Sequence, residues 1–347
     1  MRAPSRVVFG RGSASRLPSA LEIPERRAFL VSSPTVLRLH GDVLRSALAP
    51  RPVVEIEMDD GEPAKTFATL GTILDRAIGA GVRRDDYLIA AGGGVVTDVA
   101  GLAASILLRG VAWYAVPTTL VGMADAAIGG KTAVDHPLGK NLIGTFHAPS
   151  GVLIDPELLS TLPARRFREG IVEIFKTLLV ARPEAARRMA GGLEATAANR
   201  EIDAALEEAI AAKVEIVARD PRDAGERRTL NFGHTLGHAI EASGGFDRWT
   251  HGEAVALGMA AALRLSAARE GFPEGDADAL VSELVRFGGG LAGGAPEWSE
   301  RLERALGLDK KGTSGAPVAI LLSDWGRPVV RPVEPAAWRS ALESLRA

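Results

Sequence analysis

The side chains best suited to chemistry include Lys131, Lys140 and Asn141, which lie among four glycines in the stretch from Gly129 to Gly144. Glycine lets a backbone approach a ligand closely, and a lysine ammonium is a compact donor suited to phosphate or carboxylate. The pattern therefore predicts a loop that closes on a small anion. A solvated loop of glycine and lysine is the alternative, and the rest of the chain must decide between the two.

Histidines form a second cluster, because three of the six lie within residues 234–251. On a helix, His234 and His238 share a face, and His251 could join them from the next helix. Two or three imidazoles can bind a metal ion, and a carboxylate such as Glu173, on the apolar side of an expected helix, would suit as a further ligand. A single histidine is more often a packing residue, but the cluster favours a metal site. Spacing alone does not decide whether His234 or His238 is the ligand.

A third candidate is the run Gly92–Gly94, which joins an apolar strand at 87–91 to an expected helix. At such a turn the pyrophosphate of a dinucleotide can approach the N–H groups of the helix N-terminus. The spacing differs from the usual G-x-G-x-x-G pattern, so a tight turn without a ligand is an equal alternative. Asp98 lies one turn into the helix, and Thr118 and Thr119 follow the next strand. We therefore expect these side chains at neighbouring strand ends.

The use of lysine is also informative, because only seven of the 41 basic residues are lysines. An ammonium has a compact shape and an adjustable pKa that a guanidinium lacks, so the retained lysines are candidates for function. Their retention by chance is the alternative. The seven are Lys65, Lys131, Lys140, Lys176, Lys213, Lys310 and Lys311.

The elements that must position these groups begin with alternating strand-like runs and helical patterns. The expected strands are 28–32, 53–57, 87–91 and 111–116, and the expected helices run to residue 48, over about 66–79 and after residue 94. Repeated β–α units imply a mostly parallel sheet that is covered on both faces.

The pattern changes after Leu158, where alanine-rich helical stretches over 165–219 and 234–269 replace the strands. Residues 318–322 and 329–330 predict a late β-hairpin. We therefore expect an α/β fold, with a mostly parallel sheet domain over residues 1–163 and a mainly α-helical domain over residues 164–347.

Composition sets broad limits on the class of protein. The chain has 347 residues, 46% of them hydrophobic, and a formal net charge of −2, which gives no bulk reason to expect nucleic acid or an anionic membrane as a partner. It has no cysteine, which excludes disulfides, thiolate catalysis and cysteine-bound metals. No run approaches the ~18 uninterrupted apolar residues of a membrane span. We expect a soluble, cytoplasmic protein.

Together these motifs, in order and with compatible gaps, resemble the 3-dehydroquinate synthase family from about Glu62 to Gly326, a range that contains all seven lysines. The motifs that carry the resemblance are Gly92–Gly94 to Asp98, Arg109-Gly110, Pro117–Thr119, Asp125 to Thr132, Gly139–Gly144, Thr161–Pro163, Glu173 with Lys176, Arg227 with Leu230–His238, His251–Glu253 and Asp309–Lys311.

The resemblance implies an NAD-dependent enzyme with zinc or cobalt and a Rossmann-like N-terminal domain, acting as a homodimer on a small phosphorylated sugar acid. Its reaction would convert 3-deoxy-D-arabino-heptulosonate 7-phosphate to 3-dehydroquinate and phosphate, in the shikimate route to aromatic amino acids. The steps would be transient oxidation, phosphate elimination, re-reduction and intramolecular aldol closure.

The resemblance also implies roles for single residues. The metal ligands would be Glu173, His234 and His251, which leaves His238 as a substrate contact. Phosphate would be held by Lys131, Asn141, His238 and Lys310, with Arg109 reaching in from the partner subunit. The hydroxyls and carboxylate would be held by Asp125, Lys176, Lys213, Arg227 and Asn231, with Lys140 nearby. The cofactor would contact Glu62, Lys65, Gly93, Gly94, Asp98, Thr118, Thr119, Lys140 and Thr161. The choice between Lys310 and Lys311 stays open.

The chain departs from the family pattern at four places. Thr97 stands where glycine is usual, Ser33-Pro34-Thr35 replaces a segment with Asp or Asn near the adenosine, Pro221 replaces a Glu after Asp220, and Arg166 replaces the Glu of an Arg–Glu pair on the cofactor side. The alternatives are another sugar phosphate cyclase, a metal-dependent polyol dehydrogenase, which would produce NADH, and a non-catalytic binding protein.

Overall fold

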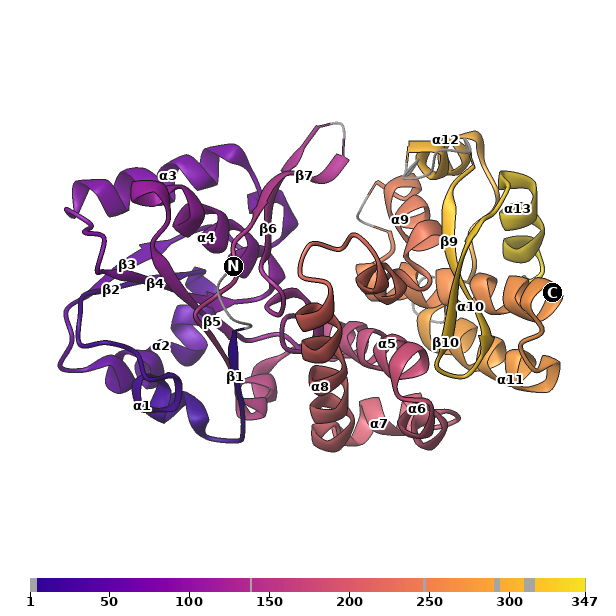
Figure 1. Cartoon of the computed structure of the whole chain (residues 1–347), viewed down its shortest axis with the longest axis horizontal. Coiled ribbons are helices and arrows are strands. Elements are labelled where there is room, and N and C mark those ends of the chain that lie inside the picture. The colour runs from indigo at the N-terminus through magenta and orange to yellow at the C-terminus, as the bar shows by residue number, and fades with distance from the viewer. Residues whose placement is uncertain (1–4, 138, 246–247, 290–293, 309–315, 347) are drawn as a thin grey trace. The chain divides into compact units, whose positions relative to one another are not determined.

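The computed structural model describes residues 5–137, 139–245, 248–289, 294–308 and 316–346. The chain divides into two compact units, Met1–Phe167 and Arg168–Ala347 (Figure 1). None of the helices in these described ranges is long and apolar enough to cross a membrane.

The first unit is built on a six-stranded sheet in which every neighbouring pair is parallel. In spatial order the strands are β1 (Arg6–Phe9), β8 (Gly151–Ile154), β5 (Ala112–Pro117), β4 (Tyr87–Gly92), β2 (Ala28–Ser32) and β3 (Val53–Glu57). Strands β2, β4 and β8 are buried along their whole length, as a sheet covered on both faces requires. The predicted parallel sheet is confirmed, with β1 and β8 as additional short strands.

Helices cover both faces of this sheet. Helices α3 (Phe67–Gly79) and α4 (Gly94–Ile106) lie on one face, and α1 (Leu17–Leu21) and α2 (Pro34–Leu48) lie on the other (Figure 1). The Ser33 hydroxyl accepts a hydrogen bond from the N–H of Val36, and Thr66 accepts one from Thr69, so each caps the helix that follows it. Among the described residues of this unit are also the 3₁₀ helices Ser13–Arg16, Glu62–Ala64, Leu107–Arg109 and Pro156–Thr161 and the π-helical turn Gly122–Ala126.

The stretch expected to be an anion-binding loop is instead a β-hairpin, so that prediction of local structure is wrong. Strand β6 (Lys131–His136) pairs antiparallel with β7 (Gly139–Phe146). Apolar and β-branched side chains, including Val134 opposite Ile143, pair across the two strands and outweigh the glycines that suggested a loop.

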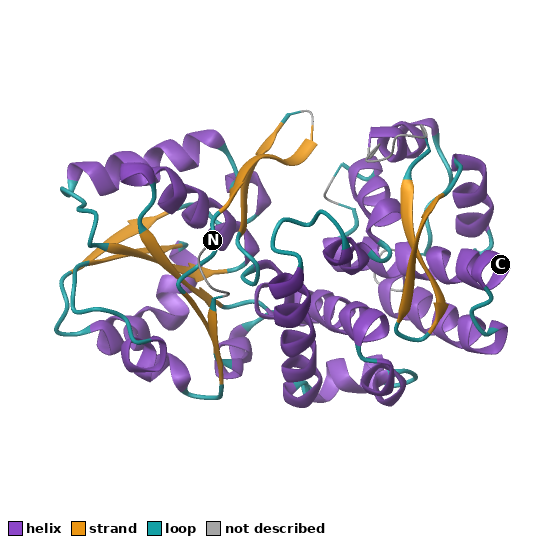
Figure 2. Ribbon diagram, in the orientation of Figure 1, coloured by secondary structure: helices purple, strands orange, loops and turns teal. Residues whose placement is uncertain are grey.

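In its described residues the second unit is mainly helical, with an antiparallel hairpin, as predicted (Figure 2). Its helices are α5 (Ala164–Ala181), which begins at the end of the first unit, α6 (Pro183–Met189), α7 (Leu193–Asn199), α8 (Asp203–Arg219), α9 (His234–Ser243), α10 (His251–Glu270), α11 (Glu274–Leu284), α12 (Glu300–Leu308) and α13 (Pro335–Glu343). The 3₁₀ helix Glu226–Asn231, the π-helical turn Val285–Gly289 and the strands β9 (Val318–Asp324) and β10 (Arg327–Pro332) complete it. Helix α10 packs against α9, α11, α13 and β9, and it is buried without a break from Gly252 to Leu263.

Candidate metal centre and ligand-binding residues

Three side chains from three helices of the second unit meet in a possible metal site. Glu173 lies on α5, His234 begins α9 and His251 begins α10. One ligand atom from each of them lies within 4.8 Å of the others. The ring of His238 lies beside the two histidines, with centroids 5.2 Å from His234 and 6.2 Å from His251. The predicted convergence of imidazoles with a buried carboxylate is therefore present.

Close helix packing brings these side chains together. A Cβ on Gly258 of α10 would lie 2.0 Å from the carbonyl oxygen of Gly233, just before α9. A Cβ on Gly252 would lie 2.4 Å from the Cα of Glu169 on α5. These two positions allow α10 to approach both other helices of the site, which a larger residue would prevent.

The start of α10 is fixed by a capping box. The Thr250 hydroxyl accepts a hydrogen bond from the N–H of Glu253, and the Glu253 carboxylate accepts one from the N–H of Thr250. The capping box fixes the start of the helix and therefore the position of the Cα–Cβ bond of His251, its first residue.

The carboxylate of Glu173 is fully buried, and its two oxygens have different surroundings. Oε2 accepts a hydrogen bond of 2.5 Å from the Lys176 ammonium. Oε1 faces the Nε2 atoms of His251 at 3.2 Å and His234 at 3.6 Å, and among the described residues no hydrogen bond of good geometry reaches it. One carboxylate oxygen and two imidazole nitrogens that point at one another are a donor set suited to zinc.

The other ring nitrogen of each histidine has a partner. His234 Nδ1 lies 3.2 Å from the carbonyl oxygen of Phe232, and His251 Nδ1 lies 3.5 Å from Oε2 of Glu241. Such contacts orient an imidazole and leave Nε2 to bind a metal. The donor set and its surroundings fit a divalent cation.

The protonation of the three groups follows from burial and charge. Burial opposes ionisation of Glu173, but the Lys176 ammonium and the two imidazoles hold its pKa well below the usual range. Burial and then the Lys176 charge lower the pKa of His234 well below its usual value, which keeps this imidazole neutral. Burial would lower the pKa of His251 too, but the carboxylates of Glu173 and Glu241 raise it to about 10. Metal binding must therefore displace a proton from His251.

The first unit holds a separate polar network. The buried Lys65 ammonium donates to Asp98 Oδ2 at 2.6 Å and to Asn141 Oδ1 at 2.5 Å. Lys140 Nζ lies 3.2 Å from a carboxylate oxygen of Glu62. Burial opposes the charge on Lys65, but Asp98 outweighs it and raises the pKa of the lysine. Five of the residues predicted to contact cofactor or substrate thus lie together.

The glycine turn lies at adjacent strand ends, as predicted. Gly93 is the N-cap of α4 and, within the described chain, no side chain caps the first N–H groups of this helix. The N–H of Thr118 donates to the carbonyl oxygen of Gly92 at 2.9 Å. A Cβ on Gly93 would lie 3.0 Å from the methyl group of Thr119. Helical N–H groups that no side chain caps, at a turn made of glycines, fit a pyrophosphate.

The other predicted residues are spread over both units. In the first, Lys131 begins β6, Asp125 lies in the π-helical turn, Arg109 is exposed at a φ of 69°, and Thr161 Oγ1 lies 3.0 Å from His40 Nε2. In the second, Lys213 is buried on α8, Arg227 is buried, Asn231 is half-buried, and both of the latter lie in the 3₁₀ helix Glu226–Asn231. Lys310 and Lys311 lie outside the described residues.

Two residues near these groups were not predicted from the sequence. Glu241 follows His234 and His238 at helical spacing, a signal that could have identified it as the partner of His251. Asp135 accepts a hydrogen bond from the N–H of Asn141 at 2.8 Å, and its own N–H donates to the carbonyl oxygen of Lys65. The contact between Asp135 and Asn141 depends on the pairing of β6 with β7, which the sequence did not reveal.

Known proteins are similar to this chain in sequence. Residues 55–169 match the model of the 3-dehydroquinate synthase N-terminal family, and residues 170–312 match that of the C-terminal family. A 3-dehydroquinate synthase of Pelobacter propionicus is 43% identical over 300 residues, which are 83% of this chain and 81% of the relative. One from Bordetella pertussis is 38% identical over 342 residues, which are 97% and 95% of the two chains.

Solved structures of two cyclising synthases have a similar fold. A 2-epi-5-epi-valiolone synthase from Streptomyces hygroscopicus subsp. jinggangensis, with NAD⁺ and Zn²⁺ bound, is 30% identical at a TM-score of 0.88 and covers 100% of this chain and 98% of its own. A 2-deoxy-scyllo-inosose synthase, complexed with carbaglucose-6-phosphate, NAD⁺ and Co²⁺, is 26% identical at a TM-score of 0.83, with coverage of 97% and 96%.

The fold and the triad of Glu173, His234 and His251 define an enzyme of the sugar phosphate cyclase class. Within that class, the chain belongs to the 3-dehydroquinate synthase family.

Proposed function

We propose that this enzyme is a 3-dehydroquinate synthase that converts 3-deoxy-D-arabino-heptulosonate 7-phosphate to 3-dehydroquinate and phosphate. The steps are transient oxidation, phosphate elimination, re-reduction and aldol closure. The enzyme is thus a phosphate-eliminating lyase of the shikimate pathway. The observation that carries the proposal is the buried Oε1 of Glu173, which faces the Nε2 atoms of two imidazoles.

The metal would be held by Glu173, His234 and His251, and zinc or cobalt suits these ligands. When bound, the metal would polarise a secondary alcohol of the substrate, and NAD⁺ would provide a reversible hydride acceptor for the carbon that carries this alcohol. Lys176 keeps Glu173 ionised and thus able to bind a cation. We assign a substrate contact to His238, whose ring lies beside that of His234.

NAD would lie at the strand ends of the first unit. We place its pyrophosphate at Gly93 and Gly94, where helical N–H groups can donate to it. The remaining cofactor contacts would be Glu62, Lys65, Asp98, Thr118, Thr119, Lys140 and Thr161. On this proposal, residues 1–163 serve the nucleotide and residues 164–347 serve the metal and much of the substrate.

The substrate is a polyanion, so cationic and amide groups would bind and orient it. The proposed phosphate contacts are Lys131, Asn141, His238 and Lys310. The proposed contacts to the hydroxyls and carboxylate are Asp125, Lys140, Lys176, Lys213, Arg227 and Asn231.

We also propose that the enzyme is a cytoplasmic homodimer, with Arg109 contacting the phosphate bound by the partner subunit. Arg109 is exposed at the end of a short 3₁₀ helix, beside the apolar residues Ile106 and Leu108, which are 46% and 39% exposed. An arginine flanked by exposed aliphatic side chains suits contact with a second copy of the chain.

A phosphate-release assay with the heptulosonate phosphate and a catalytic amount of NAD⁺ tests the function. We expect many phosphates per NAD⁺, no accumulation of NADH, and loss of activity on chelation. Accumulation of one NADH per substrate would instead indicate a polyol dehydrogenase, and no phosphate release from this substrate would refute the assignment.

A further inference from the structure

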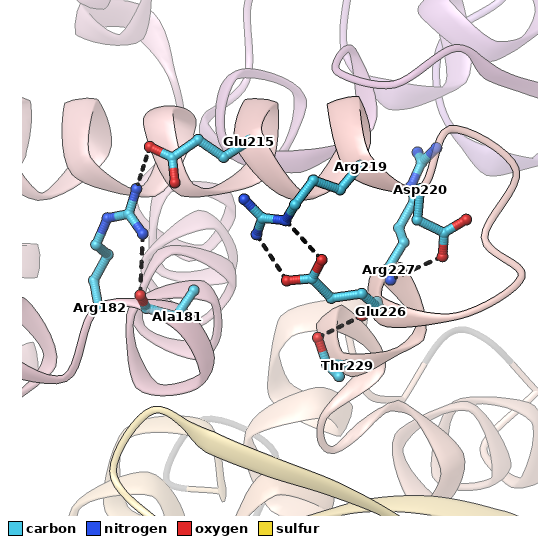
Figure 3. Close-up of polar contacts among 8 residues, drawn as sticks. All are labelled: Ala181, Arg182, Glu215, Arg219, Asp220, Glu226, Arg227 and Thr229. Carbon is cyan, nitrogen blue, oxygen red and sulfur yellow. Dashed lines mark hydrogen bonds and ion pairs between the residues drawn. The ribbon is translucent and has the colours of Figure 1, made fainter.

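The loop between α8 and the 3₁₀ helix Glu226–Asn231 is folded around one carboxylate, that of Asp220. The N–H of Ala224 donates to Oδ1 at 3.0 Å, and the N–H of Gly225 donates to Oδ2 at 2.7 Å. The N–H of Arg227 also donates to Oδ2, at 3.0 Å (Figure 3). These backbone hydrogen bonds, that of Ala224 first, hold the pKa of Asp220 below its usual range. The side chain therefore stays ionised and binds both the loop and the start of the next helix.

Arg227 binds residues 220–221 through both its backbone and its side chain. Its backbone N–H binds Asp220, and its side-chain Nη1 donates to the carbonyl oxygen of Pro221 at 3.2 Å. Arg227 is only 3% exposed, and burial lowers its pKa. The direction of this guanidinium therefore depends on the path of residues 220–221.

A second interaction spans the same loop but lies at the surface. Arg219 and Glu226 form a two-pronged ion pair, with both N–O distances at 2.7 Å (Figure 3). Their side chains are 55% and 45% exposed, so the pair contributes little to stability. Breaking the exposed Arg219–Glu226 pair is therefore a control for removing the Asp220 carboxylate, which binds the backbone of the same loop.

We propose that Asp220 is a positioning residue that acts through Arg227, holding its guanidinium where it meets an anionic group of the substrate. This inference rests on the role given to Arg227 in the proposed function. Without the carboxylate, three backbone N–H groups lose their acceptor, and the loop and the start of the 3₁₀ helix can shift. Arg227 would then be presented in several directions.

Steady-state kinetics of Asp220→Ala test this role. We expect the KM for the heptulosonate phosphate to rise about tenfold, the size of effect expected for one charge-assisted contact. We expect the KM for NAD⁺ and the affinity for zinc to stay within about twofold of wild type, because neither contact set includes Arg227. Asp220→Asn keeps one acceptor oxygen and should recover part of the loss. Glu226→Gln breaks the exposed pair and should leave the kinetics unchanged.

A double-mutant cycle separates positioning from general stability. If Asp220 acts through Arg227, adding Asp220→Ala to Arg227→Ala should cost no further activity. Losses that multiply, or a wild-type KM in Asp220→Ala, would overturn the inference; if that variant does not fold, Asp220→Asn takes its place in the cycle. A wild-type enzyme that released no phosphate would overturn the proposed function and this role with it, whereas multiplying losses in active variants would overturn this role alone.

Discussion

Replacing Gly252 by alanine tests whether close packing of α10 against α5 holds the triad together. The new Cβ would lie 2.4 Å from the Cα of Glu169, and ordinary van der Waals contact begins at 3.4 Å, so the two backbones must separate by about 1 Å. Gly252 adjoins His251, and Glu169 lies one turn before Glu173. Separating the two helices would therefore lengthen the 3.2 Å distance between Nε2 of His251 and Oε1 of Glu173. Metal sites tolerate deviations of only about 0.2 Å.

We therefore expect Gly252→Ala to bind zinc at least about tenfold more weakly. Overpacking should also lower the free energy of unfolding by about 1–3 kcal/mol. Zinc affinity is measured by competition with a chelator, and stability by urea denaturation of the metal-free protein.

The matched control is Gly275→Ala on α11, where a Cβ would meet no atom within 4 Å. This variant should bind zinc as wild type does and should be slightly stabilised, by about 0.5–1 kcal/mol. Wild-type zinc affinity in Gly252→Ala would refute the argument that this helix contact positions the ligands.

Three further outcomes are expected. Lys65→Met leaves the Asp98 carboxylate, only 17% exposed, without its ammonium and should destabilise the protein by about 3 kcal/mol in urea unfolding. Lys140→Met breaks a more exposed pair and should cost less than about 1 kcal/mol, and equal costs would contradict this reasoning. Burial lowers the pKa of His40 in the folded state, so the unfolded chain takes up a proton first and stability should fall as the pH drops below about 6.5; a fall as steep in His40→Gln would show another origin. Because the pKa of His251 is raised to about 10, zinc binding near pH 7.5 should release about one proton, measured by calorimetry in buffers of different ionisation enthalpy, and no release would contradict the protonated form.

The sequence was most informative where periodicity decides the outcome. Long apolar runs predicted the central strands of the parallel sheet, and the four-residue spacing of His234 and His238 predicted their shared helix face. The strands β1 and β8 have only four residues each, too few for a periodic signal.

Contacts made by backbone geometry could not be read from the sequence. The hairpin at 131–146 depends on cross-strand pairing, and its glycines suggested a loop. The approach of Gly252 to α5 could be predicted only by knowing which helices pack against each other. The role of Asp220 depends on the path of a loop whose residues bind through their N–H groups, which side-chain identity does not reveal.

Anomalous diffraction from zinc-loaded crystals tests the central claim most directly. We predict one strong peak within about 2.0–2.2 Å of a carboxylate oxygen of Glu173 and of Nε2 of both His234 and His251, with His238 unligated. A zinc ion held by His238 in place of His234, or bound away from Glu173, would contradict the account.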